Sequence, residues 1–370
     1  MWRTRWDACS PRRATATRAG KILVDQTELL REVVATAVHD KRQLKICGQG
    51  SKTHCLPEIS GEMVSTVEHT GIVALEPEEL VVTVRSGTPL KELRQELARG
   101  RQMLGAEPPE FSGLGTVGGA LAAGFSGPGR PWRGSLRDSM LGVELVNGKG
   151  ELLKFGGQVM KNVAGYDVSR LNAGAFANLG LVLQISLRLV PLTDHTRTLC
   201  YELDGAAALA FCRQLARKPY PVTATFWHEG NLALRFDGSE SALDTAEEHL
   251  GGDRDATNGF WSNVRDHRHE AFSSLPHGGA IRVICPPNAP APENFSWSFE
   301  WNGGLRWIWA DSISADIADY VDSIKGWAWQ LGQEIPIESG QRQIMRRIKL
   351  AFDPDAVFRS PLNLLSNSDN

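Results

Sequence analysis

Apolar residues recur at helical spacing in some stretches of the chain and alternate with polar residues in others. A helix is predicted over Asp25–Gln43, where the apolar residues form one stripe, and a short strand, Leu44–Cys47, follows it. Thr88-Pro89 favours the start of a second helix, and Gly100 favours its end. Strands are also predicted at Val73–Leu75, Leu80–Val84, Leu141–Val146, Glu151–Phe155 and Leu183–Leu189.

A second block of alternating elements begins near Asp194. It contains a hairpin, hinged at Glu229-Gly230, with predicted helices before and after it in the sequence. This order predicts a smaller antiparallel sheet with helices on one face, so the fold class of the whole chain is α+β. The predicted elements are Thr198–Leu203, Val222–Trp227, Asn231–Phe236 and Gly304–Ala310 as strands, and Gly205–Arg217, Ser239–Leu250, Ile313–Lys325 and Ile344–Phe352 as helices.

The composition is that of a globular protein of two or three domains. The 370 residues carry 40 basic and 43 acidic side chains, a net charge of −3, which gives no general attraction to nucleic acid. The longest uncharged run, 111–129, is rich in glycine, and no transmembrane segment or secretory signal is predicted. The six cysteines form no C-x-x-C pair, so no zinc site or iron–sulfur cluster is indicated, and their spread is typical of a cytoplasmic protein. Residues 1–20, rich in arginine, are interpreted as a disordered tail, with a targeting peptide as the alternative.

Two glycine-rich turns, at 48–50 and 113–119, suit anion binding because they present backbone N–H groups without obstructing side chains. The second opens the segment Val117–Gly124, whose helix N-terminus would point at the same anion. It also fits G-x-G-x-x-G, but Pro108-Pro109 stand where a Rossmann motif requires a strand. Gly50–Thr53 lacks the glycine that precedes the lysine of a P-loop. The two turns together predict a pyrophosphate clamp, and ordinary turn glycines are the alternative.

Other polar and aromatic residues are weaker candidates. His267 and His269 have a spacing that faces away from a common ligand on a helix, which predicts a surface helix. Lys161–Asp167 gathers a lysine, an amide, a phenol and a carboxylate, and fits either a functional loop or a loop capped by Asp167. The tryptophans of segment 301–309 fit either a docking face or the core of the second domain.

One run of residues resembles a known family. Residues 155–171 read Phe-Gly-Gly-Gln-Val-Met-Lys-Asn-Val-Ala-Gly-Tyr-Asp, then Val and Ser-Arg-Leu. With Thr116–Gly119, Arg137–Val146 and Phe352–Pro354, this run resembles the FAD-linked oxidases of the vanillyl-alcohol oxidase/p-cresol methylhydroxylase (PCMH) type, and among them the FAD-binding subunits of glycolate oxidases. The resemblance covers roughly residues 21–360. It implies a PCMH-type FAD-binding domain of two subdomains over 21–193, a smaller α/β cap domain with an antiparallel sheet over 194–343, and a C-terminal segment, 344–370, that returns to the flavin.

The resemblance also implies which residues contact FAD. Ile46–Lys52 matches the first pyrophosphate loop of the family, Gly115–Gly119 the second flavin loop, and the turn at Arg133 and the segment 179–182 match two further contacts. The predicted FAD-binding residues are Gly48, Gln49, Gly50, Ser51, Lys52, Gly115, Thr116, Val117, Gly118, Gly119, Arg133, Gly134, Ser135, Asp138, Gly180 and Val182.

Departures from the family pattern modify these expectations. Ser51 stands where covalently flavinylated relatives carry histidine, so FAD is predicted to bind non-covalently. Phe358–Pro361 replaces the closing Phe-Asn-Pro-Gly of the family, which alters the C-terminal flavin contact. The catalytic flavin subunit of such a complex resembles enzymes that have a histidine-pair metal site in the cap. The cap of this chain has no such pair, so no metal is predicted. No catalytic residue is assigned, although Arg235, His228 and Arg282 lie on cap elements.

The resemblance implies an FAD-dependent oxidoreductase acting on CH–OH donors, namely the FAD-binding subunit of a complex that oxidises glycolate to glyoxylate. The implied partners are a larger flavin subunit and an iron–sulfur subunit, through which the electrons leave. The complex is expected in the cytoplasm, with peripheral attachment to the inner membrane as an alternative. Two other functions stay open: a self-sufficient FAD-dependent 2-hydroxyacid dehydrogenase, and a non-catalytic electron-relay or structural flavin subunit.

Overall fold

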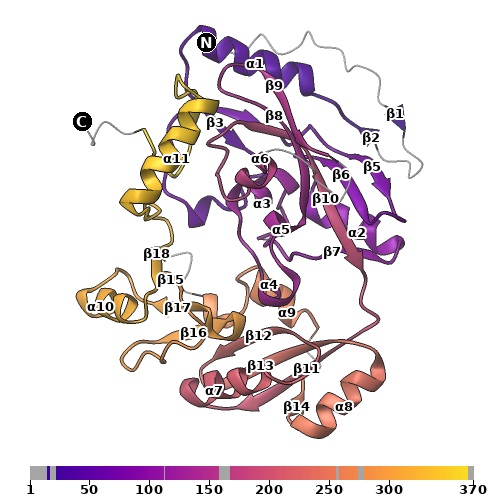
Figure 1. Ribbon diagram of the computed structural model, residues 1–370, viewed down its shortest axis with the longest axis vertical. Coiled ribbons are helices and arrows are strands. Elements are labelled where there is room, and N and C mark those ends of the chain that lie inside the picture. The colour runs from indigo at the N-terminus through magenta and orange to yellow at the C-terminus, as the bar shows by residue number, and fades with distance from the viewer. Residues whose placement is uncertain are drawn as a thin grey trace.

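The computed structural model describes residues 15–16, 22–111, 113–157, 167–255, 258–273 and 279–365. Two bodies of secondary structure lie one above the other (Figure 1): the N-terminal domain, formed by the elements between Ile22 and Pro191 and by those from Ser339 onward, and the cap domain, formed by the elements between His195 and Gln330. Strand β10 (Leu181–Pro191) leads down into β11 (His195–Glu202), and helix α11 (Ser339–Phe352) leads back. In the parts of the chain described, no helix is long and apolar enough to cross a membrane.

The first sheet of the N-terminal domain has three parallel strands, in the spatial order β19 (Phe358–Arg359), β3 (Leu44–Cys47) and β4 (Glu62–Ser65). Helix α1 (Thr27–His39), shorter than predicted, packs against it through Leu30, Val34 and Ala37, which share one face because they are four and three residues apart. Strand β3 has the predicted bounds. Two short strands, β1 (Thr15–Ala16) and β2 (Ile22–Leu23), pair with each other before α1.

The second sheet is antiparallel, in the order β5 (Ile72–Glu76), β6 (Val81–Arg85), β10, β8 (Met140–Val146) and β9 (Leu152–Gly156), with β7 (Gln102–Leu104) on the end of β10. The two predicted strand pairs, β5–β6 and β8–β9, are confirmed. The alternation in β10 predicts one buried face, but both faces are mostly buried. Helices α2 (Leu90–Arg99) and α3 (Val117–Ala123) cover one side, and α1 with β3 covers the start of the other.

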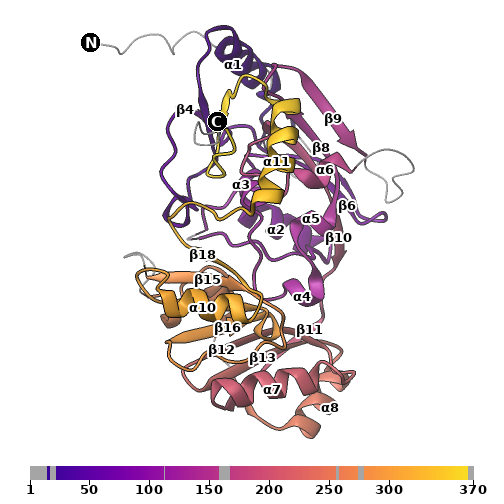
Figure 2. The ribbon, with the colours of Figure 1, turned by 60° about the vertical axis from the view of Figure 1, so that its left-hand side comes forward.

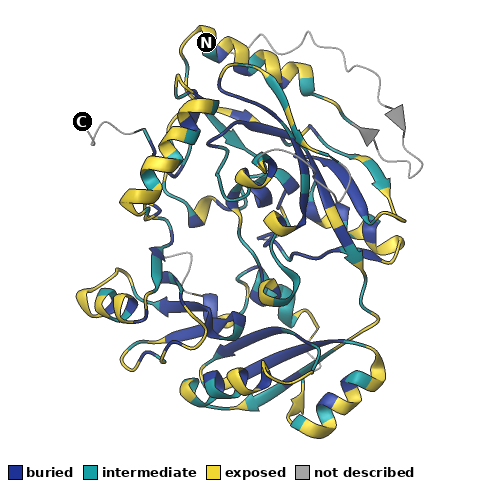
Figure 3. Ribbon diagram, viewed as in Figure 1, coloured by how far each residue is buried: buried dark blue, intermediate teal, exposed yellow. Residues whose placement is uncertain are grey.

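The cap domain holds an antiparallel sheet in the order β14 (Asp253–Arg254), β11, β13 (Asn231–Gly238), β12 (Val222–His228), β16 (Trp297–Glu300), β17 (Leu305–Trp309), β15 (Ala280–Ile284) and β18 (Trp327–Gln330). Helices α7 (Gly205–Leu215), α8 (Glu240–Leu250) and α10 (Ala315–Ser323) cover one face (Figure 2), as the sequence predicts. Ile281 and Val283 of β15 face these helices, so the alternate residues, Arg282 among them, face the N-terminal domain. Figure 3 shows the buried sheet strands with exposed helix faces outside them.

Ion pairs fix the cap against the N-terminal domain. Arg133, at the end of the short helix α4 (Arg130–Arg133), pairs with Glu107 at 2.8 Å and with Asp237 of β13 at 2.5 Å. Arg235 of β13 reaches back to Glu107 at 2.8 Å. Each arginine therefore contacts a carboxylate of the other domain, which sets the orientation of the two domains and the shape of any site between them.

The C-terminal segment is anchored by a buried lysine of α11. Lys349 donates hydrogen bonds to the carbonyl oxygens of Asn178 at 2.8 Å and Phe358 at 2.9 Å, and to the carboxylate of Asp353. Asp353 is fully buried and also accepts two backbone N–H groups from the start of β19. These contacts hold β19 beside β3 and so bring Arg359 next to the first glycine loop.

Candidate functional site

A cleft in the N-terminal domain lies between the first glycine loop and α3. Its cavity volume is about 150 Å³, and the cleft opens to solvent. The predicted loop residues Gly48–Lys52 all line it. No described residue accepts a hydrogen bond from the backbone N–H groups of this loop. Gly50 has a left-handed φ of +69°, and free N–H groups around such a residue form a concavity suited to a phosphate.

The second glycine segment reaches the same cleft through Thr116, Gly118 and Gly119. A β-carbon at Gly48 would lie 2.6 Å from Thr116 Oγ1, so the two loops are in direct contact. The structure thus brings together the two segments from which the sequence predicts a pyrophosphate clamp.

The N–H groups at the start of α3 nevertheless have protein partners. Those of Val117, Gly118 and Gly119 donate to the Thr88 carbonyl, the Ser86 carbonyl and the Thr116 hydroxyl, at 2.9, 2.7 and 3.1 Å. These donors are used within the protein, and pyrophosphate binding at this helix N-terminus stays a prediction. Gly118 has a packing role: a β-carbon there would lie 2.6 Å from Ser86 Cβ.

Ser86 is the polar group of the cleft that most needs a ligand. Its side chain is 1% exposed, it lines the cleft, and no described residue bonds to its hydroxyl. Lys45, Lys52 and Arg359 also line the cleft and give it positive charge. Burial lowers the pKa of Lys52 to about 8, so an anion beside it would favour its charged form. An anionic ligand that accepts hydrogen bonds fits these residues.

Three other predicted contacts lie behind the surface of the cleft, while Val182 lines it. Val117 is fully buried in the core beneath α3. A β-carbon at Gly115 would lie 3.0 Å from Glu110 Cα, and one at Gly180 would lie 2.6 Å from the Val146 carbonyl oxygen. These residues support the walls of the cleft by close packing of the backbone.

The predicted turn at Arg133–Asp138 lies outside the residues that line the cleft. Arg133 is used in the interdomain ion pairs. Ser135 and Asp138 cap helix α5 (Leu136–Ser139) reciprocally, with Asp138 accepting bonds from both the N–H and the hydroxyl of Ser135. Gly134 precedes them with φ of +77°. A flavin contact at this turn stays a prediction.

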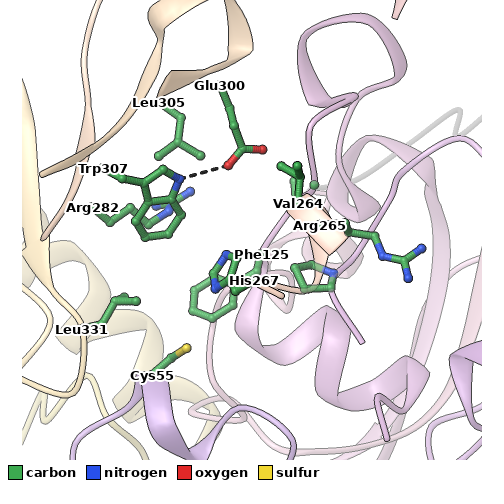
Figure 4. Close-up of a pocket in the computed structure, with 13 residues that line it drawn as sticks. Cys55, Phe125, Val264, Arg265, His267, Arg282, Glu300, Leu305, Trp307 and Leu331 are labelled. Carbon is green, nitrogen blue, oxygen red and sulfur yellow. Dashed lines mark hydrogen bonds between the residues drawn. The ribbon is translucent and has the colours of Figure 1, made fainter. Parts of the chain in front are cut away.

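A second cavity, called the chamber below, lies between the cap sheet and the N-terminal domain (Figure 4). Its cavity volume is about 20 Å³, which is room for about one water molecule. Arg282 of β15, Glu300 of β16 and Trp307 of β17 line it from the cap, and the Trp307 indole N–H donates to Glu300 Oε1 at 3.0 Å. Burial raises the pKa of Glu300 to about 7 and lowers that of Arg282 to about 10. Cys55 lines the opposite side, and burial raises the pKa of its thiol to about 12, so it stays protonated.

His267 lines the chamber as well, and the prediction that it lies on a surface helix is wrong. Helix α9 (Phe260–Arg265) ends two residues earlier, and His267 turns inward with φ of +51°. Its ring stacks on Phe272, with centroids 4.5 Å apart, and burial lowers its pKa to about 3, which keeps it neutral. Within the described residues, no group of three His, Cys, Asp or Glu side chains is arranged to hold a metal ion.

Two candidates remain from the sequence analysis: the tryptophans of segment 301–309 and the loop 161–167. Trp301 and Trp307 are 5% and 2% exposed, so they belong to the core between the domains and form no docking face. Asp167 accepts the Arg170 N–H at 3.3 Å and caps helix α6 (Val168–Leu171), which is one of the two alternatives given for the loop 161–167. The other residues of that loop lie outside those described.

Comparison with known proteins places the chain among flavoproteins. A family model described as an FAD binding domain matches residues 19–156. Glycolate oxidase subunit GlcE of Escherichia coli is 34% identical over 339 residues, covering 90% of this chain and 96% of that protein. Glycolate oxidase subunit GlcD of Bacillus subtilis is 30% identical over 192 residues, covering 50% of this chain and 40% of that protein. A solved structure of alkyldihydroxyacetonephosphate synthase, 13% identical, covers 92% of this chain and 75% of its own with a TM-score of 0.66, which shows the same fold.

The family model and the relatives identify an FAD-linked oxidoreductase of the class that acts on CH–OH donors. The chain belongs to the family of the glycolate oxidase FAD-binding subunit, and its cofactor is FAD. The predicted resemblance, fold class and cofactor are thereby confirmed. The cleft suits this cofactor: its basic side chains and its loop amides, which donate to no described residue, match a pyrophosphate. The Ser86 hydroxyl, which bonds to no described residue either, offers a further bond.

Several residues of these sites carry no local signal in the sequence. Ser86 follows β6 and Arg359 lies in β19, so folding brings them to the first loop from positions far along the chain. The sequence analysis places Arg282 on a cap element, but no local signal marks Glu300, the last residue of β16. Their meeting in one chamber depends on strand order, which the sequence did not predict.

Proposed function

We propose that FAD lies in the cleft with its pyrophosphate on the backbone N–H groups of Gly48–Lys52. The observation that supports this most is the run of free donors in a loop that carries basic residues at both sides. Lys52 and Arg359 would balance the phosphate charge, and the Ser86 hydroxyl would donate a hydrogen bond to the cofactor. Thr116 and Gly118 would hold the second wall by packing. Gly115, Val117 and Gly180 would support the walls of the cleft by packing. The turn 133–138 would lie outside the cleft.

The attachment is proposed to be non-covalent, because Ser51 lines the cleft where covalently flavinylated relatives carry histidine. Precipitation of the flavin-loaded protein with acid tests this. The yellow colour is expected in the supernatant. Colour that stays in the pellet after washing would show a covalent bond, and Cys47, which also lines the cleft, would then be the residue to replace.

We further propose that the chain is the FAD-binding subunit of a glycolate oxidase complex that oxidises glycolate to glyoxylate. The near full-length similarity to a glycolate oxidase subunit supports this. FAD supplies the two-electron acceptor, and the protein supplies its position and electrostatic surroundings. The partners would be a larger flavin subunit and an iron–sulfur subunit, and the complex would lie in the cytoplasm, with or without peripheral contact to the inner membrane.

Co-expression with the two partners tests this assignment. The three chains are expected to co-purify and to reduce a dye with glycolate, while this chain alone shows little turnover. Omission of this chain should abolish the activity. Full turnover by the isolated chain would favour the self-sufficient 2-hydroxyacid dehydrogenase, and full activity of the other two subunits without it would favour a structural subunit.

A further inference from the structure

Helix α11 is the longest of the described helices, with 14 residues, yet the rest of the chain covers little of it. Lys349 is its single buried residue, whereas α1, one residue shorter, buries three apolar side chains. On the outer side of α11, Ile344 is 62% exposed and Leu350 is 42% exposed. A surface helix normally turns its large apolar residues inward, so an outer side of this kind is typical of a contact surface.

The outer side of α11 is also positively charged. Arg346 and Arg347 are exposed and form no ion pair with any described residue, and α11 contains no acidic residue. The segments outside the described residues carry two acidic residues, Asp7 and Asp369, against seven lysines and arginines. Those segments therefore offer little negative charge to α11, although the chain as a whole has a net charge of −3.

Helix α10 of the cap domain carries the opposite charge. Asp316, Asp319 and Asp322 recur at intervals of three residues, are exposed, and form no ion pair with any described residue. This spacing places them along one side of the helix, while the other side packs into the core of the cap. Ile313, which precedes α10, is 38% exposed. The outer side of α10 is thus acidic with an apolar residue beside it, which complements α11.

The two helices lie on the same side of the molecule, one on each domain. Figure 1 shows α11 above α10 at the left, and in Figure 2, where that side has come forward, both helices face the viewer. A two-fold axis that runs perpendicular to this side, between the helices, would set α10 of each copy against α11 of the other. A two-fold contact uses the same surface on both copies, so a surface with one helix of each charge is self-complementary.

We propose that this surface, called the α10–α11 face, joins two copies of the chain in a two-fold dimer. The exposed arginines of α11 in each copy pair with the exposed aspartates of α10 in the other. The apolar side chains of Ile313, Ile344 and Leu350 lose contact with water in the dimer, which favours association. The charges fix the register and the choice of partner, because α10 against α10, or α11 against α11, would place like charges together.

Sedimentation equilibrium of the FAD-loaded chain tests the dimer. The parent is expected to be dimeric at micromolar concentration and low ionic strength, and the dimer should weaken in about 0.5 M salt, which screens exposed charges. A single exposed ion pair contributes little, so two charges are reversed on each helix. Arg346→Glu/Arg347→Glu should weaken dimerisation at least about tenfold, because it sets like charges against each other. Asp319→Lys/Asp322→Lys should do the same.

Mixing these two variants is the sharpest part of the experiment. The first variant has acidic side chains at the exposed positions of both helices, and the second has basic ones at the reversed positions. Each variant is expected to be monomeric alone, while a mixture should form heterodimers in which both helix contacts are restored. A dimer in the mixture also shows that both variants are folded, and the flavin spectrum shows that they retain FAD.

Lys91→Glu/Arg188→Glu is the matched control, because it makes the same change of charge at exposed positions on α2 and β10, outside the α10–α11 face. It should dimerise as the parent does. A monomeric FAD-loaded parent, reversed variants that stay dimeric, or a mixture without dimers would overturn the proposal. If a monomeric parent binds the larger flavin subunit, or vesicles of phosphatidylcholine and phosphatidylglycerol, and Arg346→Glu/Arg347→Glu abolishes that binding, the outer side of α11 belongs to that partner and the dimer is refuted.

Discussion

The buried carboxyl group of Glu300 predicts a specific dependence of stability on pH. Burial raises its pKa from 4.5 to about 7, against the opposing effects of the Trp307 hydrogen bond and Arg282, and Glu107 adds to the rise. Below pH 4.5 the group is protonated in both the folded and the unfolded state. Between pH 4.5 and 7 the unfolded chain loses this proton while the folded chain keeps it, so the stability contribution is lost as pH rises.

The size of this effect follows from the shift. A difference of 2.5 pKa units between 4.5 and about 7 corresponds to about 3 kcal/mol at pH above 7, at 1.36 kcal/mol per unit. Glu300→Gln cannot ionise and keeps an oxygen for the Trp307 N–H. The variant should therefore gain stability over the parent as pH rises, by a few kcal/mol at pH 8 and by little at pH 5.

Urea unfolding of the ligand-free, FAD-loaded protein at pH 5, 6.5 and 8 measures this difference. Glu293→Gln is the control, because Glu293 is exposed in the loop before β16, and its difference from the parent should not change with pH. A Glu300→Gln difference that is the same at all three pH values would refute the reasoning, since it would show that Glu300 ionises alike in the folded and unfolded chain.

Three further substitutions test the cleft and its support. Gly118→Ala places a β-carbon 2.6 Å from Ser86 Cβ, and urea unfolding should show a loss of about 1–3 kcal/mol; an unchanged midpoint would mean that α3 shifts freely. Ser86→Ala removes a hydroxyl that bonds to no described residue, so FAD titration should show affinity weakened about 3- to 10-fold without a change in apoprotein stability, and equal affinity would exclude this contact. Lys349→Met leaves the buried Asp353 without its cation, so the free energy of unfolding should fall by about 3–5 kcal/mol and FAD should be lost. Arg347 is exposed on the same helix, and Arg347→Met should change the free energy of unfolding by less than about 0.5 kcal/mol. Equal effects of the two substitutions would contradict the anchoring role.

Local features of the fold could be predicted because their signals lie within a few residues. The hairpin β12–β13 follows from apolar alternation on either side of Glu229-Gly230, which take positive φ of 44° and 86°. Strand β3 and the glycine loop after it are likewise adjacent in sequence, so Gly48–Lys52 were identified together. The wrong inference at His267 has the opposite cause, since a single positive φ after α9 reverses the direction of the side chain.

The glycines of the second segment show a deeper limit. A glycine marks a place where something approaches the backbone closely, but the sequence does not say whether a ligand or another strand approaches. At Gly118 the neighbour is Ser86, and at Gly180 it is the Val146 carbonyl. The contacts that complete both cavities, such as Arg359 and Arg282, depend on long-range pairing of strands, which periodicity alone does not specify.

The position of the cofactor tests the central claim most directly. An experimental structure of the FAD-loaded protein should show the pyrophosphate within hydrogen-bond distance of the backbone N–H groups of Gly48–Lys52, with the Ser86 hydroxyl bonded to the same cofactor. A pyrophosphate on the N-terminus of α3, or at the turn formed by Arg133–Ser135, would contradict the account, because the first would require its paired N–H donors to be released and the second would leave the cleft without its ligand.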